Sequence, residues 1–288
     1  TPKIALIGNP NAGKSSLFNS LTGLNQKTGN FPGVTMEKHT GIWELEPKKP
    51  VEILDLPGIY SIYPKSIDEE LVINILGDPS HPDFPDMAIV VADASNLKRN
   101  LLLFSQVRDL GIPTVLALNM IDVAENEGYV INSIKLAREL NVEVAEVNAK
   151  KGIGLNGLKL AVVKTLANRY ASNDALPLPV SEDVIQEVQA KFGEGEMYRS
   201  LLWLMEHDRM KMFTKQQRET FDVIQNKHHF SSKKYQSEET VKRYEQITEV
   251  VDRCVINLNR QWDAVPVRTW TDRLDKFFLH PVGAMYSF

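Results

Sequence analysis

The chain has 288 residues, of which 43% are hydrophobic and 24% are charged, and its formal net charge is −4. This size and composition are typical of a globular protein with one large or two medium domains, and no apolar run reaches the length of a membrane span. The slightly acidic balance excludes an overall basic field, so we expect no nucleic-acid partner.

The first element is an apolar run over residues 3–7, which predicts a strand. It leads into Gly8-Asn9-Pro10-Asn11-Ala12-Gly13-Lys14-Ser15, and a helix-like run follows over residues 16–21. A G-x-x-x-x-G-K-S pattern between a strand and a helix predicts a phosphate-binding loop. The alternative to a phosphate-binding loop is an ordinary strand–turn–helix without a ligand, and the strand before the pattern and the helix after it make this alternative the less favoured one.

The residue types of this loop fit a nucleotide phosphate. Gly8 and Gly13 allow backbone conformations that a Cβ atom would obstruct, so successive N–H groups can surround an anion. Lys14 is expected to reach the β- and γ-phosphates, and the Ser15 hydroxyl is expected to bind Mg²⁺. The start of the following helix, at Ser16, adds partial positive charge.

Residues 1–170 alternate strand-like and helix-like segments, which predicts an α/β fold with a mostly parallel sheet and helices on both faces. The later strands are expected at residues 40–46, 51–56, 87–92, 113–118 and 142–147. The helices are expected at residues 97–110, 133–140 and 155–170. The first two of these strands should form a hairpin across Pro47-Lys48-Lys49-Pro50, and the polar residues 24–39 should form a mobile loop.

Two further elements are expected to sense the γ-phosphate. Asp55-Leu56-Pro57-Gly58 ends a strand, so the Asp55 carboxylate would hold Mg²⁺ through water and the Gly58 amide would contact the γ-phosphate. In the polar loop, Gly33-Val34-Thr35 would bring the Thr35 hydroxyl to Mg²⁺ when GTP is bound. A D-x-x-G pattern is weak by itself because both residues are common in turns, and its position after a phosphate loop gives it weight.

The base is expected to be read by two elements at strand ends. In Asn119-Met120-Ile121-Asp122, the Asp122 carboxylate would accept from guanine N1–H and the 2-amino group, donors that adenine lacks there. Met120 stands where many GTPases have lysine, and its aliphatic chain would still cover a face of the base. In Asn148-Ala149-Lys150, the Ala149 amide would contact guanine O6. These motifs predict a GTPase and disfavour an ATPase of the same fold.

Two positions bear on hydrolysis. Ile59 follows Gly58, where many GTPases have the glutamine that orients the attacking water, so we expect hydrolysis to be slow or organised by other groups. Asn11 stands where potassium-activated GTPases have an asparagine whose oxygen holds K⁺ against the phosphates. Such a cation would supply the charge that an arginine finger supplies elsewhere. The alternative is that Asn11 only shapes the loop.

Several strings are more specific than the nucleotide motifs. Together they resemble the N-terminal cytosolic GTPase region of the ferrous iron transport protein B family. The strings are residues 8–19, Gly29-Asn30-Phe31-Pro32-Gly33-Val34-Thr35, residues 55–61 and Asp93-Ala94-Ser95-Asn96-Leu97-Lys98-Arg99-Asn100-Leu101. The resemblance is strong over residues 3–160 and looser beyond. The sequence departs from the common pattern at Phe31, where tryptophan is common, and at Asn148, where serine is common.

The composition changes after a connector at residues 171–181. Residues 182–262 contain neither proline nor strand-like alternation, and the patterns at 184–192, 197–206, 215–224 and 239–262 predict a small helical domain. Ser181 and Thr214 are expected N-caps. The charges on these helices, including Arg243, are interpreted as solvated faces. The single cysteine, Cys254, excludes an internal disulfide, fits a reducing cytoplasmic setting and should be buried.

The remaining features concern metals and the membrane. His207, His228 and His229 lack acidic or cysteine partners at ligand spacing, so we do not expect a metal site there. The aromatic and basic residues of 263–288 are typical of an interfacial segment that leads to a membrane span, although a helix that closes the helical core is an alternative. The resemblance favours the first, so we expect 263–288 to lead toward a membrane domain that is absent from this chain. The sequence does not begin with methionine, and we expect a fragment of a longer protein.

We hypothesise that residues 1–170 form a Mg²⁺-dependent domain that binds and hydrolyses GTP. Its hydrolysis is expected to be slow and to be activated by K⁺. This domain is joined to the helical domain at 182–262. The residues expected at the nucleotide are Gly8, Asn9, Asn11, Ala12, Gly13, Lys14, Ser15, Ser16, Gly33, Val34, Thr35, Asp55, Gly58, Asn119, Met120, Asp122, Asn148, Ala149 and Lys150. Catalytic roles are assigned to Asn11, Lys14, Thr35 and Gly58. Mg²⁺ is assigned to Ser15, Thr35 and Asp55, and K⁺ to Asn11. Ordering of residues 24–38 and 57–70 by the γ-phosphate would be the switch.

The resemblance implies that this unit regulates or powers Fe²⁺ uptake at the cytoplasmic face of the bacterial cell membrane. It implies a helical domain that stabilises bound GDP, and partners that include the protein's own membrane domain, absent from this chain. Small accessory proteins of the same transport system and a homo-oligomer are further expected partners. The alternative is a free GTPase of the ribosome- or RNA-associated class, against which the acidic balance argues because such proteins usually carry a basic appendage.

Overall fold

One sheet organises the first half of the chain. The computed structural model describes residues 1–23, 26–31, 36–168, 180–193 and 195–258, and within them a seven-stranded sheet has the order β2-β3-β4-β1-β5-β6-β8. Its strands are β1 (Lys3–Gly8), β2 (Gln26–Asn30), β3 (Glu37–Glu46), β4 (Lys49–Asp55), β5 (Met87–Asp93), β6 (Thr114–Asn119) and β8 (Glu143–Glu146). Neighbours from β4 to β8 are parallel, whereas β2 and β3 are antiparallel additions at one edge.

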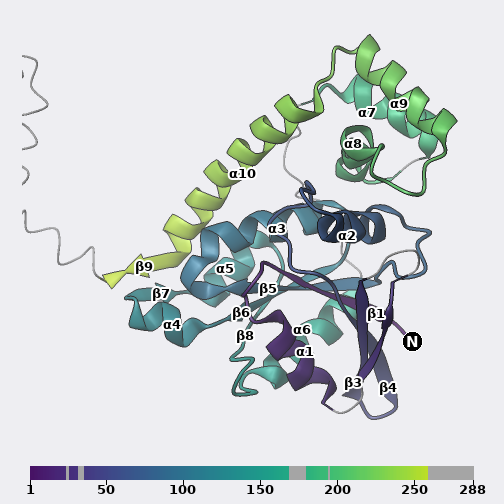
Figure 1. Cartoon of the computed structure of the whole chain (residues 1–288). Coiled ribbons are helices and arrows are strands. Elements are labelled where there is room, and N and C mark those ends of the chain that lie inside the picture. Colours follow the sequence, from purple (N-terminus) through teal and green to yellow (C-terminus); the bar gives the residue numbers. More distant parts are fainter. Residues whose placement is uncertain (24–25, 32–35, 169–179, 194, 259–288) are drawn as a thin grey trace, which may run out of the picture.

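Both faces of the sheet are buried because residues of the parallel strands alternate between two helical layers. Ile4 and Leu6 of β1 belong to the core formed with α1 (Lys14–Thr22) and α6 (Leu155–Asn168). Ala5 and Ile7 belong to the core formed with α2 (Ile67–Gly77), α3 (Leu97–Asp109) and α5 (Ser133–Leu140). The predicted α/β class with a mostly parallel sheet is therefore confirmed (Figure 1).

The expectation of a loop over residues 24–39 is wrong where the structure describes it. Gln26–Asn30 forms β2, which pairs antiparallel with the first residues of β3. All five residues of β2 are exposed, so backbone pairing holds this edge strand and its sequence carries no alternation of apolar and polar residues. The predicted hairpin over residues 40–56 is confirmed as the antiparallel pair β3–β4.

The second half of the described chain is helical, as the sequence predicts. Its helices are α7 (Glu182–Phe192), α8 (Met197–Glu206), α9 (Lys215–Lys227) and α10 (Ser232–Cys254). Phe221 stacks on Phe192 at 3.9 Å between ring centroids and meets Phe213 edge-on at 4.8 Å. Thr214 forms a capping box at the start of α9, and Ser181 is the N-cap of α7. None of the described helices has both the length and the apolarity of a membrane span.

Helix α10 carries the chain back from the helical region to the first half of the chain, where it packs against α3 and α5 (Figure 1). It ends at Cys254, which is buried as predicted, and β9 (Val255–Asn257) then pairs antiparallel with β7 (Tyr129–Ile131). The expectation that residues 182–262 contain no strand is therefore wrong, because the partner of β9 lies in the first half of the chain. The interpretation of Arg243 as solvated is also wrong, since Arg243 is fully buried between two carboxylates.

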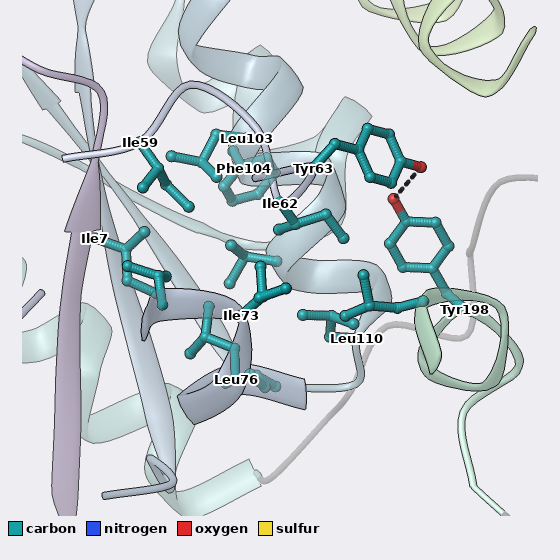
Figure 2. Close-up of a cluster of buried hydrophobic side chains, with 14 of the residues drawn as sticks. Ile7, Ile59, Ile62, Tyr63, Ile73, Leu76, Leu103, Phe104, Leu110 and Tyr198 are labelled. Atoms are coloured by element: carbon teal, nitrogen blue, oxygen red, sulfur yellow. Dashed lines mark hydrogen bonds between the residues drawn. The ribbon is translucent and has the colours of Figure 1, made fainter. Parts of the chain in front are cut away.

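The helical region packs on α2. The Trp203 Nε1 of α8 donates to the Gly77 carbonyl at 2.8 Å. The Asn74 side chain donates to the Arg209 carbonyl at 3.0 Å and accepts from the Lys211 amide at 2.6 Å. Apolar residues of α2, α3 and α8 belong to one buried cluster, and Figure 2 shows Tyr63 and Tyr198 meeting at its border.

Candidate nucleotide-binding site

The predicted phosphate loop joins β1 to α1. Gly8 ends β1, and Gly13 precedes the first helical residue with a left-handed φ of 91°. A Cβ atom on Gly8 would lie 2.7 Å from the Val91 carbonyl oxygen, and one on Gly13 would lie 2.1 Å from Asn119 Nδ2. Close approach therefore requires glycine at both positions, and the backbone conformation requires it again at Gly13. These are the constraints that a phosphate cradle imposes.

Lys14 and Asp55 meet beside this loop. Lys14 Nζ donates to Asp55 Oδ1, and each side chain is 11% exposed. Burial raises the pKa of the Asp55 carboxyl, and the neighbouring Lys14 charge partly offsets that rise. This ion pair joins Lys14, which is expected to bind the phosphates, to Asp55, which is expected to hold Mg²⁺. A nucleotide polyphosphate with Mg²⁺ would offer each of them a new partner of opposite charge, so the residues fit that ligand.

Other residues of the loop and of the first turn of α1 carry polar side chains. Asn9 is 4% exposed, and both atoms of its carboxamide lack a hydrogen-bond partner within the described part of the chain. An unpaired buried amide costs about 1–3 kcal/mol, so a ligand or bound water that pairs it would stabilise the loop. Asn11 is exposed with a left-handed φ of 66°, and Ser15 and Ser16 are exposed in the first turn of α1.

Gly58 lies directly against the phosphate loop. A Cβ atom on Gly58 would be 3.1 Å from the Pro10 nitrogen, and the next amide, of Ile59, donates to the Gly8 carbonyl at 3.2 Å. The Ile59 side chain is 0% exposed and belongs to the core. Its burial agrees with the inference that Ile59 does not orient a water molecule, because it is apolar and turned away from solvent.

Asn119, at the end of β6, connects two loops. Its Nδ2 donates to the Ala12 carbonyl at 2.9 Å, and its Oδ1 accepts from the Ala149 amide at 3.0 Å. Ser20 of α1 adds a hydrogen bond to the Ala149 carbonyl at 2.7 Å. The phosphate loop and residues 148–150 are therefore held at a fixed separation. The Ala149 amide already has a partner, so its expected contact with guanine O6 requires that hydrogen bond to be shared or exchanged.

Asp122 lies in the first turn of α4 (Ile121–Asn126), with its side chain 48% exposed. Its Oδ2 accepts from Asn148 Nδ2 at 3.0 Å and from Lys151 Nζ at 3.4 Å. Met120 precedes the helix with a φ of 62°, an uncommon conformation for a residue other than glycine. Its methyl carbon lies 3.5 Å from the position of a Cβ on Gly13, so the residues expected to read the base adjoin the phosphate loop.

The structure therefore brings together the predicted site residues that it describes. They lie at the carboxyl ends of the parallel strands β1, β4, β6 and β8, in the last residues of these strands, the loops that follow them and the first turns of α1 and α4. Lys150 is exposed within the last of these loops. Gly33, Val34 and Thr35 lie outside the described residues, as do residues 263–288 and most of the connector at 171–181.

Sequence reasoning missed residues of α3 that hold the segment after Gly58. Gln106 is 0% exposed, and its Oε1 accepts from the Ile62 amide at 3.2 Å. The guanidinium of Arg99 lies 3.9 Å from the centre of the Tyr60 ring. The available signal was weak, because a glutamine in a helix of mixed composition has no fixed spacing from the motif that it supports.

The histidines have other partners. His207 is bonded to the Leu204 carbonyl at 3.0 Å and to Asp222 at 3.2 Å, and His228 is bonded to Glu187 at 2.8 Å. In the part of the chain that the structure describes, no group of three histidine, cysteine, aspartate or glutamate side chains is arranged to hold a metal ion.

The chain is similar to known proteins over nearly its full length. Residues 2–162 match the model of the family described as ferrous iron transport protein B. A curated relative, the Fe(2+) transporter FeoB of Leptospira biflexa, is 32% identical over 295 residues, which cover 99% of this chain but 41% of the relative. This chain therefore spans about two fifths of that protein.

Solved structures agree in fold. The cytosolic domain of L. pneumophila FeoB superposes with a TM-score of 0.73 at 32% identity, covering 88% of this chain and 99% of that one. A GDP-bound point mutant of the S. thermophilus FeoB G-domain has a TM-score of 0.67 at 32% identity, covering 89% and 100%. The chain therefore belongs to the ferrous iron transport protein B family and contains the family's GTPase domain.

Proposed function

We propose that this chain binds GTP and GDP with Mg²⁺ and hydrolyses GTP at the loops that follow β1, β4, β6 and β8. The observation that carries the proposal is the Asn119 side chain, which ties the phosphate loop to residues 148–150 beside Asp122. The residues proposed for the phosphates and those proposed for the base would thereby belong to one site. Lys14 would bind the phosphates, while Ser15, Asp55 and Thr35 would hold Mg²⁺. The GDP-bound S. thermophilus relative supports this assignment.

The base assignment is tested by Asp122→Asn. The carboxylate accepts two hydrogen bonds from guanine, whereas an amide cannot accept from both donors and instead matches the 2-oxo group of xanthine. We expect GTP affinity to fall by about 100-fold and xanthosine triphosphate to become the better ligand. Competition titrations against a fluorescent GDP analogue measure both changes.

The matched control is Glu125→Gln, which removes an exposed acidic charge from the same helix α4. This control should leave the GTP-to-xanthosine-triphosphate affinity ratio unchanged. Unchanged GTP affinity in Asp122→Asn contradicts the base assignment, whatever the control shows.

We also propose that Asn11 holds K⁺ against the phosphates during hydrolysis. Its exposure at the loop supports a ligand role, whereas its left-handed φ supports the simpler role of shaping the loop, because asparagine tolerates that conformation. The two roles separate in Asn11→Gly, which keeps the backbone conformation accessible and removes the carboxamide oxygen.

We expect the parent chain to hydrolyse GTP at least tenfold faster in K⁺ than in Na⁺ buffer, and Asn11→Gly to lose that difference while retaining GDP affinity. Steady-state phosphate release in matched KCl and NaCl buffers measures the ratio. Equal rates of the parent in the two buffers, or a K⁺ stimulation retained by Asn11→Gly, contradict the cation role.

The family supports a role in Fe²⁺ uptake, with the chain as the regulatory part of a transporter at the cytoplasmic face of a bacterial cell membrane. Its partners would be the protein's own membrane domain, small accessory proteins of the same system and further copies of itself. Residues 182–262 would stabilise bound GDP. Uptake of radiolabelled iron by cells whose full-length transporter carries Gly13→Ala tests this role, and wild-type uptake by that variant contradicts it.

A further inference from the structure

The segment that connects Gly58 to α2, residues 58–66, is fixed at its first end to the phosphate loop. The Ile59 amide donates to the Gly8 carbonyl at 3.2 Å, and Gly58 lies against Pro10. This connecting segment therefore carries the glycine that would meet the γ-phosphate. Any group that sets the position of the segment sets the position of the Gly58 amide.

The far end of the connecting segment is fixed by the helical region. The Tyr63 hydroxyl lies 3.3 Å from the Tyr198 hydroxyl of α8, and the two residues are 9% and 1% exposed (Figure 2). Between the two ends, Gln106 accepts from the Ile62 amide. The helix that follows the segment is held by α8 and the 209–211 turn through Trp203 and Asn74.

Buried charges set the direction of the tyrosine hydrogen bond. The Tyr198 hydroxyl donates to Glu239 Oε1 at 2.9 Å, and Glu239 also accepts from Arg243 Nε. Arg243 Nη1 in turn donates to Asp109 Oδ2 of α3 at 2.7 Å. A hydroxyl has one proton, which Tyr198 gives to Glu239, so Tyr63 must donate to the Tyr198 oxygen.

Both hydroxyls remain protonated because burial raises the pKa of Tyr63 and of Tyr198 well above the usual value. The chain Tyr63–Tyr198–Glu239–Arg243–Asp109 therefore begins on the connecting segment, crosses into the helical region and returns to α3. We call these five residues the tyrosine–arginine network.

We propose that Tyr198 is a positioning residue for GTP hydrolysis, which acts through Tyr63 to hold Gly58 where its amide meets the γ-phosphate. The inference rests on the proposed GTPase function. It explains how a residue of the helical region reaches the nucleotide site without touching the nucleotide. The contact is important here because Ile59 is buried and supplies no polar group to the reaction. A purely structural tyrosine pair would stabilise the fold without favouring the transition state.

The test removes single hydroxyls in Tyr63→Phe, Tyr198→Phe and the double variant. Each change leaves the ring in place, so the core stays filled. We expect each single variant to lower the kcat for GTP by about 3- to 10-fold, with KM within twofold of the parent value. The double variant should be no slower than Tyr198→Phe. That single change already breaks both the Tyr63–Tyr198 and the Tyr198–Glu239 hydrogen bonds, so removing the Tyr63 hydroxyl as well breaks no further bond of the network. Tyr244→Phe, on α10 but outside the network, should leave kcat unchanged.

Three outcomes of the kinetic measurements overturn the inference. They are single variants with kcat within 1.5-fold of the parent, singles whose effects multiply in the double variant, and a loss of kcat in Tyr244→Phe as large as theirs. Thermal unfolding of each variant is measured in parallel, and a kcat that only follows the melting temperature assigns the pair a structural role. If the parent chain does not hydrolyse GTP, the proposed function fails instead, so the two failures are distinguishable.

Discussion

Gly13→Ala is expected to reduce the affinity for GDP by about 100-fold. The alanine would have to adopt the left-handed conformation of Gly13, at a cost of about 1–2 kcal/mol, and its Cβ would lie 2.1 Å from Asn119 Nδ2. Asn119 is buried, so the side chain can yield only by breaking its hydrogen bonds to Ala12 and Ala149, each worth about 1 kcal/mol. The same change therefore disturbs both the phosphate cradle and the base-reading loop.

Titration with a fluorescent GDP analogue measures this loss of affinity. Gly23→Ala is the matched control, because Gly23 caps the other end of α1 with a positive φ of 56° and no atom of the residues that the structure describes lies within 4 Å of its Cβ position. It carries the backbone strain without the clash, and we expect GDP affinity within threefold of the parent. GDP affinity in Gly13→Ala equal to that of Gly23→Ala would show that close approach at Asn119 is not what requires the glycine.

Elements with local signals were predictable from the sequence, and elements with distant partners were not. The phosphate loop and the amphipathic helix at Ser133–Leu140 have their whole signal within a few residues. Strands β7 and β9 have three residues each and pair across more than a hundred positions of sequence, so neither segment predicts the other.

Helix α2 was missed for a different reason. Ser66 is its N-cap and Asp68, Glu69 and Glu70 lie in its first turn, which are ordinary starting signals. However, every residue from Leu71 to Gly77 is buried, because the sheet lies on one side and the helical region on the other. Residues 71–77 therefore have no exposed polar face, and the alternation of apolar and polar residues that usually signals a helix is absent there.

The nucleotide motifs select the residues that we propose contact the ligand, but not the residues that support them. Residue types at fixed spacing point to Lys14 or Asp122 because a bound nucleotide would dictate them. Gln106 and Tyr198 depend only on where other segments of this fold lie, so no sequence motif at fixed spacing identifies them. Arg243 illustrates the limit, since its neighbours in sequence are solvated while its own side chain completes a buried ion pair.

Arg243→Met is expected to lower the free energy of unfolding by about 3–5 kcal/mol. Burial alone would lower the pKa of the guanidinium, but Tyr198, Glu239 and Asp109 around it more than offset this, so Arg243 is charged. Its removal leaves the carboxylates of Glu239 and Asp109 buried with reduced compensation, and an uncompensated buried charge is among the most costly defects in a fold. Urea unfolding followed by circular dichroism measures the change.

Two variants separate this explanation from a general weakness of α10. Arg253→Met, on the same helix, removes an arginine that is 47% exposed and paired with Glu139, and should cost less than about 1 kcal/mol. Adding Glu239→Gln to Arg243→Met should recover part of the lost stability, because it removes one of the charges left behind. If the double variant is less stable than Arg243→Met alone, then the cost comes from lost packing and hydrogen bonds, and the charges of the tyrosine–arginine network are not what holds α8, α10 and α3 together.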